Sequence, residues 1–117
     1  TPNEAMIEEA SARGGRIGLI ATFAPTLASM PQEFPRGAQL TPKLADGAME
    51  ALDRGNAAAH DALVVKAAMS LKDCDVIALA QFSMARAAPA IAAATGKTVL
   101  TTPDSAVKKM KALCLGG

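Results

Sequence analysis

The stretch Asp75-Val76-Ile77-Ala78-Leu79-Ala80 decides how the rest of this chain is interpreted. It is short, apolar and partly β-branched, and helical patterns flank it, which is typical of a strand buried on both faces of a parallel sheet. The polar residues Gln81 and Ser83 follow it, just before the alanine-rich segment 85–94. Because ligands of open α/β sheets bind outside the carboxyl ends of the strands, we expect a small-molecule site at Gln81 and Ser83.

Similar patterns recur outward along the chain and predict alternating strands and helices. The expected strands cover residues 16–21, 38–42, 75–80 and 97–101. The expected helices cover residues 3–13, 26–33, 43–53, 56–72 and 84–95, with a last one from Pro103 to about 113. This alternation predicts an α/β fold of three layers with about four parallel strands, in the flavodoxin-like order 2-1-3-4.

Composition limits the class of protein. With 117 residues the chain is long enough for one domain, 1–117, and too short for two. Its 12 basic and 11 acidic residues give a net charge of +1 without a basic stripe, which argues against nucleic-acid binding. No apolar run approaches the roughly 20 residues that a membrane span needs. The first residues lack a signal-peptide pattern and a starting Met, so we expect a processed or truncated cytoplasmic chain.

The cysteines and the histidine indicate little metal or redox chemistry. Cys74 is expected to be buried at the start of a strand, and Cys114 lies near the chain end. Two cysteines in such a chain are typical of reduced thiols, and a single histidine leaves no structural zinc site, so we expect no cofactor. His60 and Asp61 are neighbours on a predicted helix and point about 100° apart, so we do not expect them to form a dyad.

The other strand ends also present neutral, hydrogen-bonding side chains. Thr22 and Thr26 follow the first strand, and Thr101 and Thr102 end the fourth. Together with the helix N-termini at these turns, such an edge suits a small carboxylate or phosphate. The alternative is that these residues are ordinary caps, as Thr26 would be for the helix 26–33. The glycine fingerprints of dinucleotide and P-loop sites are absent from the sequence.

Five segments follow one another along nearly the whole chain: Ile17-Gly18-Leu19-Ile20-Ala21-Thr22 with Thr26, His60-Asp61-x-Leu-Val, Cys74-Asp75-Val76-Ile77, Leu79-Ala80-Gln81-Phe82-Ser83-Met84, and Thr98-Val99-Leu100 with Pro103. Their order and spacing resemble the second domain of the aspartate/glutamate/hydantoin racemase superfamily. The resemblance implies that the chain is the second half of a two-domain, cofactor-independent racemase-type protein.

In the resembled family each domain supplies one cysteine, and the two thiols exchange a proton with opposite faces of the substrate's Cα. This chain has Gln81 where the family has its cysteine, and an amide cannot act as that base. The resemblance implies Gln81 and Ser83 as the catalytic pair. The substrate-binding residues that it implies are Thr22, Thr26, Phe82, Thr101 and Thr102.

Three functions remain open at this point. The first is an isomerase (racemase) or lyase domain that acts on a small carboxylate, such as an amino acid. The second is a non-catalytic small-ligand or interaction module that kept the fold and lost the catalytic cysteine. The third is a flavodoxin-like response or cofactor domain, which the scarcity of acidic strand ends and aromatic residues disfavours. Apolar residues at the site edge predict a homo-oligomer or a missing N-terminal domain as partner: Phe23, Pro25, Phe82 and Met84.

Overall fold

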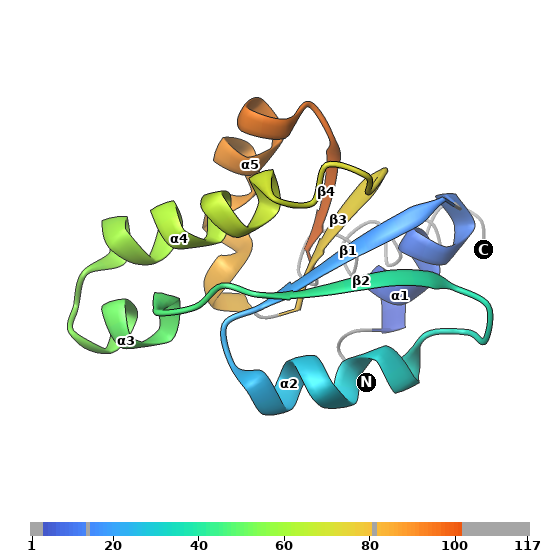
Figure 1. Ribbon diagram of the computed structural model, residues 1–117, viewed down its shortest axis with the longest axis horizontal. Coiled ribbons are helices and arrows are strands. Elements are labelled where there is room, and N and C mark those ends of the chain that lie inside the picture. The colour runs from blue at the N-terminus through green and yellow to red at the C-terminus, as the bar shows by residue number, and fades with distance from the viewer. Residues whose placement is uncertain (1–3, 14, 81, 102–117) are drawn as a thin grey trace, which may run out of the picture.

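The computed structural model describes residues 4–13, 15–80 and 82–101, without the side chain of Phe82. This part is an α/β fold with a four-stranded sheet whose strands all run parallel (Figure 1). From one edge to the other the strands are β2 (Gln39–Leu44), β1 (Arg16–Ala21), β3 (Val76–Leu79) and β4 (Thr98–Thr101). The predicted order 2-1-3-4 and the predicted parallel pairing of β1, β3 and β4 are therefore confirmed.

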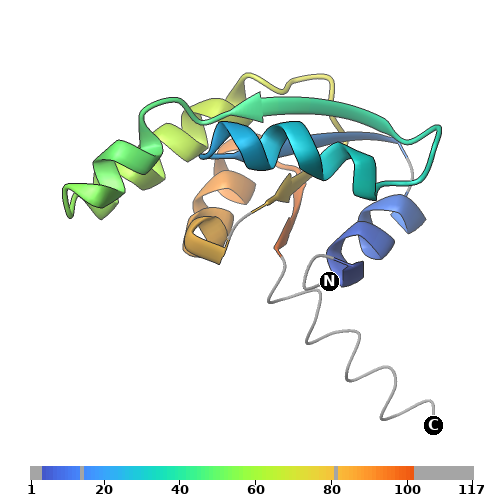
Figure 2. The ribbon, with the colours of Figure 1, turned by 90° about the horizontal axis from the view of Figure 1, so that it is seen from below.

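Helices flank the sheet on both faces (Figures 1 and 2). On one face, α1 (Glu4–Arg13) contacts β3 and β4, while α2 (Ala24–Ser29) contacts β1 and β2. On the other face, α4 (Ala57–Met69) contacts β1 and β2, and α5 (Ala88–Thr95) contacts β4 and α4. Three shorter elements connect them in the described part of the chain: the 3-10 helices η1 (Met30–Glu33) and η2 (Phe82–Ala87), and α3 (Ala48–Asp53).

The two central strands form the core because helices cover them on both sides. All four residues of β3 are buried, and in β1 only Arg16 is exposed. Such continuous burial is typical of inner strands in a parallel sheet. The edge strand β2 is mostly exposed and contains Pro42, which an edge position tolerates because one side of the strand has no neighbour to bond.

Asp75 joins the amino ends of β1 and β3 through hydrogen bonds to Arg16. Asp75 Oδ2 accepts a hydrogen bond from the Arg16 backbone N–H at 2.9 Å, and the Asp75 N–H donates to the Arg16 carbonyl at 2.8 Å. Gly15 turns the chain into β1 with φ of +76°, and a Cβ at this position would collide with the Asp75 carboxylate. Glycine is therefore required here for both its backbone angle and its size.

Two predicted helix boundaries are wrong at their starts. The helix predicted from residue 26 begins at Ala24, with Phe23 at the N-cap, so Thr26 lies inside α2 and does not cap it. Pro25 explains this, because proline is favoured at the first positions of a helix. The helix predicted over 84–95 is divided into η2 and α5, and Pro89, which cannot donate an intrahelical hydrogen bond, sits in the first turn of α5.

A third boundary differs at the end of β2. The sequence predicts that this strand ends at residue 42 and that a helix begins at 43, but β2 continues to Leu44 and α3 begins at Ala48. The ladder extends because the Ala45 N–H donates to the Ala21 carbonyl at 2.8 Å. The predicted burial of Cys74 is confirmed, with 3 % of the residue exposed. The predicted last helix and Cys114 lie outside the described residues.

The close packing of β1 against the helix-to-strand turn before β3 generates a stability prediction. A Cβ on Gly18 would lie 2.7 Å from Leu71 Cδ1 and 3.2 Å from Cys74 Sγ. We expect Gly18→Ala to lower the free energy of unfolding by about 1–3 kcal/mol, as overpacking of a core does. Urea denaturation of the purified variant measures the loss.

The control is the double variant Gly18→Ala with Leu71→Ala, in which the smaller side chain at 71 makes room for the new methyl group. Its loss should be smaller than the sum of the two single losses, because the two sites are in contact. Strictly additive losses would show that the contact with Leu71 is not what excludes a side chain at Gly18.

Candidate functional site

The carboxyl ends of the four strands lie on one side of the sheet, as parallel pairing requires. Figure 2 shows β2 running toward α3 and the start of α4, so those helices lie past the carboxyl end of this strand. The helix η2 follows β3 on the same side and packs against α4 and α5. Two segments that are distant in sequence therefore meet here, namely the first turns of α4 and η2.

The predicted site residues occupy different depths at this edge. Thr22, directly after β1, and Thr101, the last residue of β4, are buried, with 8 % and 1 % of each exposed. Thr26 is half-buried in α2, and Ser83 is exposed in η2. Gln81, Thr102 and the side chain of Phe82 lie outside the described part of the chain. Of the predicted residues that are described, Ser83 is the most open to a ligand.

Not all of the apolar residues predicted to be exposed at this edge are exposed in the structure. Phe23 is 44 % exposed and Pro25 is also exposed, in agreement with the prediction. Met84 was expected to be partly exposed as well, and this is wrong, because the side chain is fully buried in the core. It faces inward because η2 packs against α4 and α5 and encloses it.

A chain of three side chains joins α4 to η2 and corrects the prediction for His60. His60 is fully buried in α4, and its Nδ1 lies 2.8 Å from Asp61 Oδ1. Arg86 Nε, from η2, donates to the same oxygen at 3.3 Å and lies 3.2 Å from Asp61 Oδ2. Neighbouring Cβ atoms do diverge by about 100° on a helix, but the tips of two longer side chains can still converge.

The charge of Asp61 follows from its surroundings. Burial raises the pKa of Asp61, but the hydrogen bonds from His60 and Arg86 and the positive charge of Arg86 outweigh burial, and the pKa lies below its ordinary value of 3.8. The group is therefore a carboxylate at neutral pH and can only accept hydrogen bonds. We assign the proton of this contact to Nδ1 of His60 on that basis.

Arg86 is held at one atom and open at the others. All hydrogen bonds that the described residues make to its side chain use Nε, and the side chain is 52 % exposed. The terminal nitrogens of the guanidinium, which follow the carboxyl end of β3, therefore have no partner in the part of the chain that the structure describes. A guanidinium in this state can bind a carboxylate through two parallel hydrogen bonds. The sequence analysis missed Arg86, because an arginine inside an alanine-rich helical pattern carries no signal of its own.

Positively charged side chains line a small cavity of about 310 Å³ near the end of β2. Lys43 and Lys66 contribute two exposed cations to its lining and Asp46 one exposed anion. The sequence analysis missed Lys43 as well, because it assigned this residue to a helix that begins only at Ala48. With two lysines and one aspartate, the lining of this cavity carries a net charge of +1, and its lysines are solvated.

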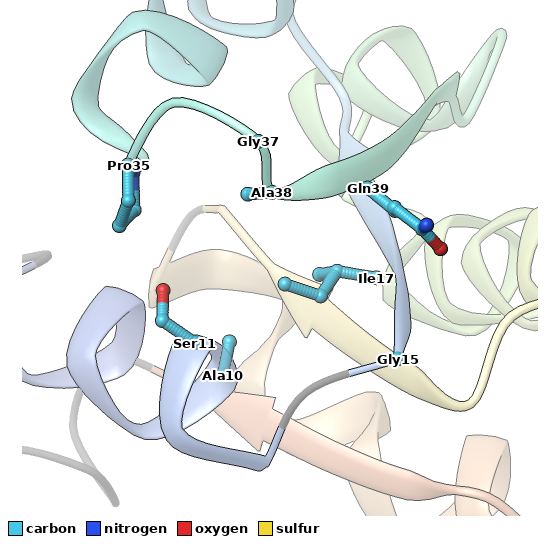
Figure 3. A pocket seen from close by; sticks show the side chains of 8 residues that line it. All are labelled: Ala10, Ser11, Gly15, Ile17, Pro35, Gly37, Ala38 and Gln39. Carbon is cyan, nitrogen blue, oxygen red and sulfur yellow. The ribbon is translucent and has the colours of Figure 1, made fainter.

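A second cavity lies at the opposite, amino edge and is the main rival position for a ligand. It has a volume of about 510 Å³ and lies between α1 and the turn into β2 (Figure 3). Ile17 and the hydroxyl of Ser11 point into it, and Ser11 Oγ has no hydrogen-bond partner in the described part of the structure. None of the eight residues that line it ionises, so it offers shape and one hydroxyl but no charge or proton-transfer group.

Comparisons with known proteins leave the resemblance to racemases as a prediction. No protein-family model matches the chain, and no curated protein matches it in sequence. Within residues 4–13, 15–80 and 82–101, no cluster of three or more potential metal ligands occurs. In the same residues, no helix combines the length and the apolarity that crossing a bilayer would require.

The low pKa of Asp61 predicts how stability changes with pH. A carboxyl whose pKa is depressed in the folded state stabilises the protein above its unfolded pKa, and this contribution is lost as pH falls through the folded value. We therefore expect Asp61→Asn to cost up to about 1 kcal/mol at pH 7, the range of exposed ion pairs. The difference from wild type should shrink below about pH 3.8.

Thermal or urea unfolding across pH 2–7 measures this difference, with pH values chosen around the ordinary range of carboxyl groups. Asp53→Asn is the matched control, because Asp53 is an exposed aspartate in the short helix α3. A difference between wild type and Asp61→Asn that stays constant with pH would contradict the assignment of an ionised, paired Asp61.

Proposed function

We propose that this chain binds a small carboxylate, such as an amino acid or a related acid, at the carboxyl ends of its strands. It would do so as a domain of the aspartate/glutamate/hydantoin racemase superfamily, and in a full-length protein it would belong to an isomerase or a lyase. A cytoplasmic location is part of this proposal, because the free, buried thiol of Cys74 suits a reducing compartment. A non-catalytic ligand-binding module with the same fold is the second candidate.

The observation that carries the proposal is the state of Arg86. Its Nε is fixed on Asp61, which orients the planar guanidinium, while its terminal nitrogens have no partner among the described residues. Asp61 is anchored in turn by His60 Nδ1 at 2.8 Å. A guanidinium that is oriented before the ligand arrives loses less side-chain entropy on binding than a free surface arginine.

The exposed Ser83 supports the same location. It lies three residues before Arg86 in the 3-10 helix η2, and side chains separated by three residues lie above one another in such a helix. Its hydroxyl can therefore donate to a carboxylate that Arg86 holds. Gln81 is adjacent to this helix in the sequence, and we propose it as a further hydrogen-bonding residue, since its amide can donate or accept but cannot take a proton from carbon.

Substitution of Arg86 tests the proposal with a matched control elsewhere in the chain. Arg86→Gln removes the guanidinium, and we expect binding of L-aspartate, L-glutamate or succinate to weaken by at least tenfold. That factor corresponds to the roughly 1.5–3 kcal/mol of hydrogen bonds to a charged group. Arg13→Gln is the matched control, because it also removes one positive charge and one surface ion pair, the pair with Glu9. Arg13 lies on α1, so this substitution should leave binding unchanged.

Titration by calorimetry or by backbone amide shifts in NMR measures both variants. Ser83→Ala and Gln81→Ala should each weaken binding less than Arg86→Gln, since they remove neutral groups. Equal affinity in wild type and Arg86→Gln would refute the site. So would ligand-induced amide shifts confined to Gly15 and Gln39, because both line the cavity at the amino edge.

The exposed apolar residue at the same edge leads to a prediction about association. Phe23 is 44 % exposed at the turn that follows β1, beside the exposed Pro25. We propose that this edge faces a second protein surface, either another copy of the chain or a further domain. We expect sedimentation at micromolar concentration to show a homodimer or higher oligomer, and Phe23→Ser to shift it toward monomer.

The matched control is Met69→Ser, because Met69 is a comparably exposed apolar residue, at 53 %, but lies at the far end of α4. It should leave the association unchanged. A clean monomer of the 11.9 kDa wild-type chain would contradict the homo-oligomer.

A further inference from the structure

One nitrogen in the interior has no partner in the described part of the protein. His60 is fully buried, its Nδ1 is bound to Asp61, and its Nε2 makes no hydrogen bond. A buried polar atom without a partner costs about 1–3 kcal/mol, and such atoms are few in folded proteins. His60 lies in the first turns of α4, on the carboxyl side of the sheet, and is linked through Asp61 to η2.

We propose that Nε2 of His60 is the proton-transferring atom of the carboxyl-edge site, with Asp61 as its positioning residue. The inference rests on the proposed function and deepens it, since it names the group that replaces a catalytic thiol. The substrate class is a carboxylate with a hydrogen on the adjacent carbon, which Arg86 would hold beside the imidazole.

The hydrogen-bond chain prepares His60 for this role. An ionised Asp61 can only accept, so the Nδ1 proton is fixed on the side of Asp61. In the neutral imidazole the lone pair is then on Nε2, the nitrogen without a partner. The same arrangement of a carboxylate that orients a histidine base recurs in enzymes of unrelated folds.

The proton transfer balances with these residues alone. Nε2 takes the proton from Cα, and the electron pair of the broken C–H bond moves into the carboxylate, which becomes an enediolate. The guanidinium of Arg86 stabilises the added negative charge, and Asp61 stabilises the imidazolium. The reverse step returns a proton from Nε2 to the same face of the carbon. A single base therefore exchanges the Cα hydrogen with solvent without inverting the centre.

A substrate can reach the buried Nε2 only when the α4–η2 contact opens. In the described residues the side-chain tie across this contact is the Asp61–Arg86 pair, which is partly exposed and contributes at most about 1 kcal/mol, and the buried Met84 of η2 adds apolar packing. A carboxylate that engages Arg86 would act directly on this tie.

The chain's single histidine makes the proposal measurable without any substitution. The ¹⁵N spectrum of selectively labelled histidine reports which ring nitrogen carries the proton. We expect the Nδ1–H form for the free wild-type protein. We expect a selective change at Nε2 on addition of about 10 mM L-aspartate or L-glutamate, well above ordinary KM values. The Nε2–H form in the free protein would overturn the proposal.

Deuterium incorporation at Cα of the same amino acids provides the second readout. We expect the wild-type chain to exchange this hydrogen in ²H₂O with retention of configuration, and His60→Gln to lose about 99 % of that rate, a hundredfold effect at the low end for an acid–base group. Lys97→Gln, at the amino edge, is the control and should keep the rate. Exchange that survives in a folded His60→Gln variant would assign the proton transfer to another group. Rapid racemisation would require a second proton-transfer group on the opposite face of Cα.

The two readouts separate this inference from the proposed function. Ligand-induced amide shifts around Arg86 with an unchanged Nε2 signal and no exchange would leave carboxylate binding intact and refute the role of His60. That result would also favour the non-catalytic module. The absence of any binding would refute both.

Discussion

The structure depends on the central pair of strands, β1 and β3, which helices bury on both faces. Backbone N–H and C=O groups in such strands are cut off from water and must be paired with neighbouring strands. Parallel pairing, from Ile17 opposite Val76 to Ile20 opposite Leu79, satisfies them, with β2 and β4 on the outer sides. Because parallel strands need crossover connections, every strand-to-helix turn is placed on the same side of the sheet.

The two edges of the sheet are stabilised differently. At the amino edge, Asp75 binds the backbone of Arg16 twice, and Lys97 Nζ donates to the carbonyl groups of Lys72 and Cys74. These bonds fix the starts of β1, β3 and β4 to backbone atoms. At the carboxyl edge, the partly exposed Asp61–Arg86 ion pair and the packing of the buried Met84 hold η2 to α4. In the described residues the amino edge is therefore fixed through backbone acceptors, and the carboxyl edge through a side-chain ion pair and apolar packing.

Periodicity predicted the sheet because its signal is strong. The buried runs of β1 and β3 leave few alternatives, and the right-handed crossover rule then selects the strand order. The boundaries were less accessible, since Pro25 and Pro89 are compatible both with a helix start and with a loop. The residues at which α2 and α5 begin depend on how α2 and η2 pack, and this packing is not visible in a local sequence pattern.

The strand ends predict a position for the candidate site but not all of the residues that could form it. Thr22 and Thr101, which the sequence predicts there, are buried, whereas Arg86, which it does not predict, is half exposed. His60 illustrates the reason. Its pairing with Asp61 depends on side-chain rotation and on an arginine 25 residues further along the chain, and neither is visible in helical spacing.

A structure of the protein crystallised with L-aspartate tests the central claim most directly, because it places the ligand without reference to any variant. The account predicts that a carboxylate of the ligand lies on the terminal nitrogens of Arg86, with its Cα facing Nε2 of His60. A ligand seated between α1 and the Pro35–Gln39 turn, with the carboxyl edge empty, would contradict it.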